Sequence, residues 1–237
     1  MERIKNAWSR HGWKMFGPVA LLNIKHRFKI LLSPGKFDAK SSVDNIPGVE
    51  TNKSVYLSAL GYTHEYGAGG NAYEPIDEEK FITVIRSLPI DPSTFCFVDL
   101  GSGKGRALFL AAKIGFNKVI GVEFSENLHL LAKKNIEAAA NSWPNTDRME
   151  VIHGDARDYA PPDAATVLYL YNPFDAQIMS PVLKTWEKSM STRVHDVWIV
   201  YANPTEAALF KHSPSLEHIS SIAGFAVFRR KNLRRAE

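Results

Sequence analysis

The chain has 237 residues, of which 45% are hydrophobic and 23% are charged, and its formal net charge at pH 7 is +4. This hydrophobic content is enough for one sizeable core, and no apolar run approaches the roughly 20 residues that cross a bilayer. The single cysteine, Cys96, excludes a disulfide within the chain. Because the N-terminus also lacks a secretory signal pattern, these features predict a soluble, cytoplasmic protein in a reducing compartment.

The positive charge is concentrated at the two ends of the chain. Residues 1–36 hold eight Lys/Arg and one acid (+7), and residues 229–237 hold five Lys/Arg and one acid (+4). The remainder has 16 Lys/Arg against 23 Asp/Glu (−7). Basic ends of this kind suit an anionic partner such as nucleic acid or a membrane surface. Solvated helix faces and a frayed tail explain the same charges, and the sequence leaves both readings open.

Before Pro75 the pattern is that of an extension. A basic amphipathic helix is predicted from Pro18 to Leu32, with Pro18 in its first turn, and a Ser/Gly/Asn-rich stretch follows from Ser33 to Asn71. We therefore expect residues 1–75 to form a basic helical extension with a lid segment, and residues 76–237 to form the catalytic domain. The helix is expected to pack on that domain, and binding to a membrane surface is the alternative.

From Asp77 onward, helical and strand patterns alternate. Such alternation predicts an α/β fold with a doubly wound, mostly parallel seven-stranded sheet that binds its ligand at the carboxyl ends of the strands. The last two strands are joined too tightly for a crossover helix, so they should form an antiparallel hairpin. The expected elements are a helix carrying Phe81, Val84, Ile85 and Leu88, the strand Phe95–Asp99, the helix Arg106–Ile114, the strand Lys118–Glu123, a helix capped by Ser125, the strands Glu150–His153 and Ala165–Tyr171, a helix starting at Ser180 and Pro181, the strand Val197–Tyr201, a short helix from Glu206, and the strands Leu216–Ile222 and Gly224–Arg229.

Candidate binding residues follow the strands at these carboxyl ends. A turn rich in glycine lets a ligand touch backbone directly, and an acid about 20 positions later is the usual partner of ribose hydroxyls. The stretch "DLGSGKGR" supplies such a turn, and Glu123 stands 22 residues after Gly101. All of these residues should meet in one crevice. They are Asp99, Gly101, Gly103 and Gly105 after the first strand, Glu123 at the second, Asp155 after the third, and Asn172, Pro173 and Phe174 after the fourth.

The glycine spacing argues against a dinucleotide. The dinucleotide fingerprint places its third glycine five residues after the first, where this chain has Arg106. A carboxylate at Asp99 would also repel a pyrophosphate, whereas it suits a ligand that carries an ammonium group. The ligand with an ammonium, a ribose and an adenine, and no phosphate, is S-adenosylmethionine. A nicotinamide-dependent oxidoreductase is the competing enzyme class.

The motifs "DLGSGKGR", "GVEFS", "GDARD" and "YNPF" together resemble the class I S-adenosylmethionine-dependent methyltransferases, over about residues 77–230. With the upstream "YEP" (Tyr73 to Pro75), the chain looks most like the Dot1-type and related protein lysine methyltransferases, in which such a tyrosine-containing segment closes over the cofactor. The resemblance implies that Asp99 and the loop Gly101–Gly105, including Ser102, lie near the methionine part of the cofactor. It further implies that Glu123 binds the ribose, that Asp155 binds the adenine amino group, that Phe124 and Ala156 flank the adenine, and that Tyr73 and Asn172 border the cofactor.

The resemblance also implies an acceptor site at "NPF". The Asn172 amide oxygen and the Pro173 carbonyl would accept the N–H groups of a nitrogen acceptor, and Phe174 would offer an aromatic face to a base or cation. Amine-methylating branches usually carry two prolines here, so the acceptor stays open: a protein lysine or other amine, or a nucleic-acid base. A simple turn at "NPF" is one alternative. A non-enzymatic, basic-armed nucleic-acid or membrane adaptor with this fold is another.

Three further expectations complete the sequence-based description. The eight histidines lack metal-ligand spacing and there is no Cys cluster, so no metal is expected. Lys104 and Arg106 are interpreted as surface charges at the start of a helix, with substrate contacts as the alternative. The segment Gly61–Pro75 is predicted to close over bound cofactor, with Tyr73 nearest to it, and a flexible linker is the alternative.

Overall fold

The computed structural model describes residues 41–54 and 73–231 of the chain. The predicted helix Pro18–Leu32, the basic residues 1–36, the last residues of the basic C-terminus and most of the segment Gly61–Pro75 lie outside the described residues. The partner and lid predictions that rest on them therefore stay predictions.

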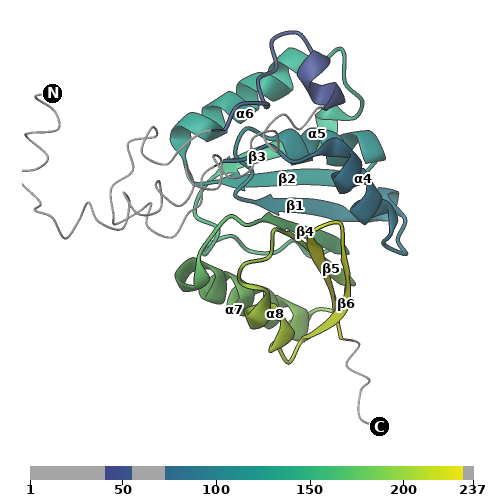
Figure 1. Cartoon of the computed structure of the whole chain (residues 1–237), viewed down its shortest axis with the longest axis vertical. Helices are drawn as coiled ribbons and strands as arrows, with labels where there is room; N and C mark the ends of the chain where they lie inside the picture. Colours follow the sequence, from purple (N-terminus) through teal and green to yellow (C-terminus); the bar gives the residue numbers. More distant parts are fainter. Residues whose placement is uncertain (1–40, 55–72, 232–237) are drawn as a thin grey trace, which may run out of the picture.

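Seven strands form one sheet in the order β3-β2-β1-β4-β5-β7-β6 (Figure 1). The pairs from β3 to β5 are parallel, while β7 runs antiparallel to both β5 and β6. The predicted mostly parallel seven-stranded sheet with a C-terminal hairpin is thus confirmed. Its strands are β1 (Cys96–Leu100), β2 (Lys118–Glu123), β3 (Met149–His153), β4 (Thr166–Tyr171), β5 (Val197–Ala202), β6 (Leu216–Ile222) and β7 (Phe225–Arg230).

Helices cover both faces of the sheet, as Figure 1 shows. One face carries α4 (Glu78–Arg86), α5 (Arg106–Ile114) and α6 (Glu126–Ala139), and the other carries α7 (Ala176–Thr192) and α8 (Ala207–Lys211). Short 3-10 turns are η1 (Ser42–Asn45), η3 (Pro92–Thr94) and η4 (Thr146–Arg148). The central strands β1 and β5 are buried along their whole length because helices pack on both of their faces.

Polar side chains determine where the helices begin. The Asp77 carboxylate accepts from the Lys80 N–H at 3.0 Å at the start of α4, and the Ser125 hydroxyl caps α6 as the sequence predicted. The predicted start of the next helix at Ser180 and Pro181 is wrong. Asp175 caps α7 through the N–H groups of Gln177 and Ile178, so Pro181 lies inside the helix.

Part of the Ser/Gly/Asn-rich stretch before the first strand belongs to the core. Val43 is fully buried and Ile46 is nearly so, and both pack in the apolar cluster formed by α4, α5 and one face of the sheet. The chain therefore contributes side chains to this cluster well before residue 76. The division into residues 1–75 and 76–237 stays a prediction of chain organisation.

Gly121 of β2 is a position where backbone approach leaves no room for a side chain. A Cβ atom there would lie 2.7 Å from Ser102 Oγ and 2.8 Å from Leu108 Cδ1. Gly121→Ala should therefore force β2 away from the glycine loop and lower the free energy of unfolding by about 1–3 kcal/mol. Chemical denaturation measures this change. Gly154→Ala, whose Cβ would meet nothing closer than 4.0 Å, is the matched control. Equal stabilities of the two variants would contradict the prediction.

Candidate functional site

The carboxyl ends of β1, β2 and β4 bring the predicted residues to one edge of the sheet. Asp99 of β1 pairs with Gly121 of β2 and with Tyr169 of β4, so β1 lies between the two strands. The glycine loop begins directly after β1, and Glu123 and Asn172 end or follow the neighbouring strands. Parallel pairing therefore places at one edge residues that are widely separated in sequence.

The glycine loop needs its glycines for their backbone conformation. Gly101, Gly103 and Gly105 have φ values of 83°, 55° and 86°, a region that side chains disfavour. The loop is tied to β2 because the N–H groups of Gly101 and Ser102 both donate to the Val122 carbonyl, at 2.8 and 3.1 Å. The loop is thus a fixed turn that carries the chain from β1 into α5.

Two predicted residues already pack against the bare Cα atoms of this loop. A Cβ atom on Gly101 would lie 2.8 Å from the Pro173 Cβ, and one on Gly103 would lie 2.2 Å from the Tyr73 ring. Phe174 ring carbons stand 3.7–3.8 Å from the same Gly101 position. The structure therefore brings Tyr73, Pro173 and Phe174 to the glycine loop, and their roles in binding stay predictions.

Asp99 is a buried carboxylate without a hydrogen-bond partner among the described residues. Its side chain is 3% exposed, and the neighbouring Tyr169 hydroxyl is also buried without a partner in this part of the chain. Burial, followed by the charge of Glu123, raises the pKa of Asp99 well above 3.8. A buried carboxylate of this kind favours a cationic ligand, which would supply the missing charge and hydrogen bonds.

Glu123 is buried beside it, but it is hydrogen-bonded. One carboxylate oxygen accepts from the Gly103 N–H at 2.8 Å and the other from the Ser125 N–H at 2.8 Å. Burial raises the pKa of Glu123, and these backbone hydrogen bonds oppose the rise. A carboxylate offers about four acceptor positions, and backbone donors from Gly103, Phe124 and Ser125 use part of them.

The residues predicted for the adenine follow β2 and β3 next to one another. Glu123 pairs with His153, and the Gly154 N–H donates to the Glu123 carbonyl, which places Phe124 and Asp155 just beyond a paired position. The Asp155 carboxylate is engaged by the Arg157 side chain, with both oxygens 3.0 Å from Nε. That hydrogen bond is the main reason why the pKa of Asp155 is lowered. Ala156 is buried in the core cluster that also contains the apolar side chains of α7.

Asn172 has a left-handed backbone, with φ of 41°, and its Oδ1 accepts from the Thr205 hydroxyl at 2.6 Å. Its N–H donates to the Ala202 carbonyl of the neighbouring strand at 3.1 Å. Asn203, at the end of β5, has a similar φ of 47° and also precedes a proline. Two Asn-Pro turns therefore stand on adjacent strands, and Thr205 links the second turn to the first.

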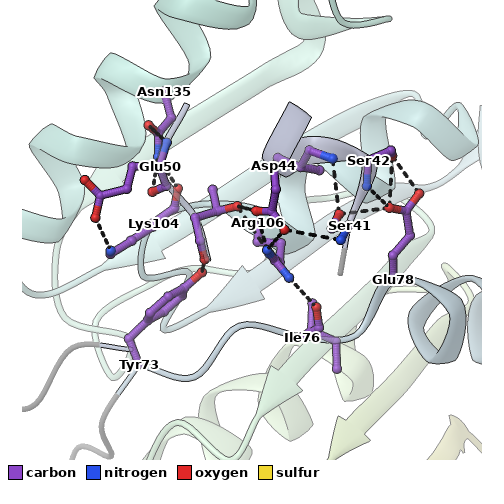
Figure 2. Close-up of polar contacts among 12 residues, drawn as sticks. Ser41, Ser42, Asp44, Glu50, Tyr73, Ile76, Glu78, Lys104, Arg106 and Asn135 are labelled. Atoms are coloured by element: carbon purple, nitrogen blue, oxygen red, sulfur yellow. Dashed lines mark hydrogen bonds and ion pairs between the residues drawn. The ribbon is translucent and has the colours of Figure 1, made fainter. Parts of the chain in front are cut away.

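Three side chains at the loop and the start of α5 are buried, namely those of Ser102, Lys104 and Arg106. Ser102 Oγ packs against Gly121 of β2 and has no hydrogen-bond partner among the described residues. Lys104 and Arg106 were interpreted as surface charges at the start of a helix, and this interpretation is wrong because both side chains are buried. The alternative, contact with a substrate, stays a prediction. Lys104 and Arg106 are each 1% exposed, and they pair with Glu50 and Asp44 of the preceding segment (Figure 2). Sequence reasoning missed these partners, although two cations in a glycine turn followed by a buried helix called for acids elsewhere.

Within residues 41–54 and 73–231, no group of three His, Cys, Asp or Glu side chains is arranged to hold a metal ion. None of the helices in the same ranges is long and apolar enough to cross a membrane.

The raised pKa of Asp99 predicts how the stability of the folded protein depends on pH. Folded Asp99 holds its proton more tightly than the unfolded chain does, so native stability falls as pH rises from 3.8 towards the folded-state value. Asp99→Asn removes this penalty, and its melting temperature relative to the parent should increase between about pH 5 and pH 8. Thermal melts of the ligand-free protein measure this difference.

Asp155→Asn is the control with the opposite sign. Because the pKa of Asp155 is lowered in the folded state, its ionised form stabilises the protein above the unfolded pKa. Asp155→Asn should therefore melt below the parent near neutral pH. If Asp99→Asn melts below the parent over the whole pH range, ionisation of buried Asp99 does not destabilise the folded protein, and the prediction is contradicted.

Comparison with protein families finds a methyltransferase domain in part of the chain. Residues 97–192 match the family model described as a methyltransferase domain. This range runs from the start of β1 to the end of α7 and includes the glycine loop, Glu123, Asp155 and "NPF". No curated protein matches the chain.

Similar solved structures are methyltransferases of several kinds. An RNA methyltransferase from Salinibacter ruber in complex with S-adenosyl-L-homocysteine is 21% identical, covering 66% of this chain and 92% of its own, with a TM-score of 0.47. A SAM-dependent methyltransferase from Geobacter sulfurreducens, in complex with the same ligand, is 27% identical over 52% of this chain and 47% of its own, with a TM-score of 0.39. A ribosomal protein L11 methylase from Lactobacillus delbrueckii subsp. bulgaricus is 14% identical over 65% and 78%, with a TM-score of 0.44. With TM-scores below 0.5, these likenesses say nothing about the acceptor.

The family match and the seven-stranded sheet agree with the resemblance seen in the motifs, and they speak against the oxidoreductase alternative. Over residues 97–192 the chain carries a methyltransferase domain, and this domain is built on a seven-stranded α/β sheet.

Proposed function

We propose that this methyltransferase transfers the methyl group to a nitrogen acceptor held at Asn172, Pro173 and Phe174. The observation that carries the proposal is the position of Asn172 at the end of β4, next to Pro173, whose Cβ lies against the bare Cα of Gly101. The acceptor would thus be held beside the loop at which we place the cofactor.

The described residues fit S-adenosylmethionine. Asp99, buried and without a hydrogen bond from the described residues, suits the ammonium of its methionine part. Glu123 has acceptor oxygens for ribose hydroxyls, and Asp155 stands at the end of β3 for the adenine amino group. Phe124 and Ala156 follow the same strand ends, and Tyr73 covers Gly103. When bound, the cofactor supplies an electrophilic methyl group on a sulfonium.

The chain's own residues then have to position a neutral nucleophile and exclude water. The Asn172 Oδ1 has two lone pairs, and the Thr205 hydroxyl occupies one of them. That hydrogen bond fixes the direction of the oxygen at which we place an N–H of the acceptor. The Pro173 carbonyl offers a further acceptor, and the Phe174 ring offers an aromatic face to a base or cation.

The arrangement supports a nitrogen rather than an oxygen acceptor because the proposed groups are neutral hydrogen-bond acceptors. An N–H donor keeps its lone pair for the methyl group while its hydrogens are held by Asn172 and Pro173. A hydroxyl acceptor would lack a general base in this set of groups. Both a protein amine and a nucleic-acid base satisfy these contacts.

The test is transfer of a labelled methyl group to fractions of a cell lysate. Protein, RNA, DNA and small-molecule fractions are separated after incubation, and the labelled product is hydrolysed to amino acids or nucleosides. Label on a lysine, another amine or a nucleobase nitrogen is the expected result. Label found only on oxygen or carbon would contradict the nitrogen proposal and leave the enzyme class intact.

Asn172→Ala should lower turnover by roughly 10-fold to 100-fold, equivalent to about 1.4–2.8 kcal/mol, and leave the cofactor dissociation constant nearly unchanged. The substitution also introduces backbone strain, because alanine disfavours the positive φ of this position. Asn203→Ala introduces the same strain on the neighbouring strand and is the matched control. Steady-state kinetics and calorimetric cofactor titration measure both effects. Equal activities of the two variants would contradict a role of Asn172 in holding the acceptor and would leave "NPF" as a structural turn only.

A further inference from the structure

The glycine loop carries two buried cations that the methyl-transfer chemistry does not use. Lys104 and Arg106 come from the same turn that is expected to hold the cofactor, and each is 1% exposed. Burial of an ammonium or a guanidinium is costly unless hydrogen bonds and an opposite charge compensate it. Their partners come mainly from residues 41–54, which we call the strap.

Arg106 contacts the strap at two points. Its Nη2 binds the Asp44 carboxylate, and its Nε donates to the Thr51 hydroxyl at 3.2 Å (Figure 2). A third contact, from Nη1 to the Ile76 carbonyl at 3.0 Å, ties it to the chain just before α4. The Thr51 hydroxyl also donates to Asp44 Oδ1 at 3.2 Å, which closes a ring of polar contacts.

Thr51 extends this ring to the cofactor loop. The Tyr73 hydroxyl donates to the Thr51 carbonyl at 2.7 Å, and the ring of Tyr73 lies over the bare Cα of Gly103. Gly103 in turn donates its N–H to Glu123. A continuous chain of contacts therefore runs from Asp44 through Arg106, Thr51 and Tyr73 to the turn itself.

Lys104 holds the other side of the loop to the strap. Its Nζ lies 2.9 Å from the Glu50 carboxylate, and its carbonyl accepts from Asn135 Nδ2 at 3.0 Å. Asn135 of α6 also bonds both the N–H and the carbonyl of Glu50, at 2.9 and 3.1 Å. The strap thus contacts the turn at two residues of the same stretch, Lys104 and Arg106.

We propose that Arg106 is a positioning residue for cofactor binding, which holds the strap so that Tyr73 is fixed over Gly103. The strap sets the shape of the cofactor loop from outside the site. This inference rests on the proposed placement of the cofactor at Asp99 to Gly105. A residue of purely structural value would change stability alone, whereas Arg106 changes the loop and the affinity for its ligand.

The strap supplies its own control at its other end. Ser41 and Ser42 bind the Glu78 carboxylate at 2.5–2.9 Å, and Lys113 joins the same group at 2.9 Å. Burial raises the pKa of Glu78, but these hydrogen bonds outweigh burial and lower the pKa to about 2, so the Glu78 carboxylate is ionised when it binds Ser41, Ser42 and Lys113. Among the described residues, Glu78 makes no direct contact with Thr51, Tyr73 or the glycine loop, and it reaches Asp44 through Ser41, whose N–H donates to Asp44 Oδ2 at 3.2 Å. Glu78→Gln therefore perturbs the strap while it leaves the contacts of Asp44 with Arg106 and Thr51 in place.

The first measurement is hydrogen exchange of the glycine-loop peptide in the ligand-free protein. Asp44→Asn and Tyr73→Phe keep the size of their side chains and weaken one link each, whereas loss of Arg106 itself risks unfolding. Both should speed exchange in Gly101–Gly105 by roughly 10-fold, and Glu78→Gln should leave it within about 2-fold of the parent. Equal acceleration by Glu78→Gln would overturn the proposal, and this result is independent of ligand binding.

The second measurement is calorimetric titration with S-adenosylmethionine, alongside thermal melts. Asp44→Asn and Tyr73→Phe should each weaken binding by roughly 10-fold, and the double variant should be no weaker than about the worse single variant because both act through Thr51. Multiplied effects in the double variant, or an equal loss in Glu78→Gln at a matched melting temperature, would contradict the positioning role. If the variants speed up loop exchange as expected but the parent protein binds no cofactor, the proposed cofactor site is contradicted instead.

Discussion

Two carboxylates buried side by side are the constraint on which the site depends. Asp99 and Glu123 end neighbouring parallel strands, and they are only 3% and 8% exposed. Burial raises the pKa of both, and the charge of Glu123 adds to the cost of ionising Asp99. A protein keeps such an arrangement at the expense of stability, and a bound cation at this edge of the sheet offsets that cost.

The strap explains why the loop's own cations do not cancel these charges. Lys104 and Arg106 are five and seven residues from Asp99 in sequence, yet they are held by Glu50 and Asp44 on the strap. Both cations are thus paired with acids of the strap, and the same contacts tie the strap to the turn that follows β1.

The alternation of patterns was sufficient to predict the sheet, its hairpin and the strand ends that carry Asp99, Glu123, Asp155 and Asn172. These predictions succeed because each depends on local periodicity and on the rule that parallel strands end at the same edge. The family model matches the part of the chain that contains them.

The contacts between distant parts of the chain were out of reach of the same reasoning. Arg106 meets Asp44 across 62 residues, Lys104 meets Glu50 across 54, and Thr205 meets Asn172 across 33. Periodicity carries no information on such pairs, and a Ser/Gly/Asn-rich stretch gave no sign that Val43 and Ile46 are core residues. The prediction of where α7 starts was wrong for a local reason: Asp175 caps the helix five residues before the expected start at Ser180.

The central claim is that buried Asp99 receives the ammonium group of S-adenosylmethionine. Calorimetric titration of the parent at about pH 6, in two buffers with different ionisation enthalpies, tests this claim most directly because an ammonium favours the ionised form of a carboxylate whose pKa is raised. The account predicts that binding releases protons from the parent, and that Asp99→Asn binds more weakly and releases none. Equal affinity of parent and variant, with no proton release in either, would contradict it.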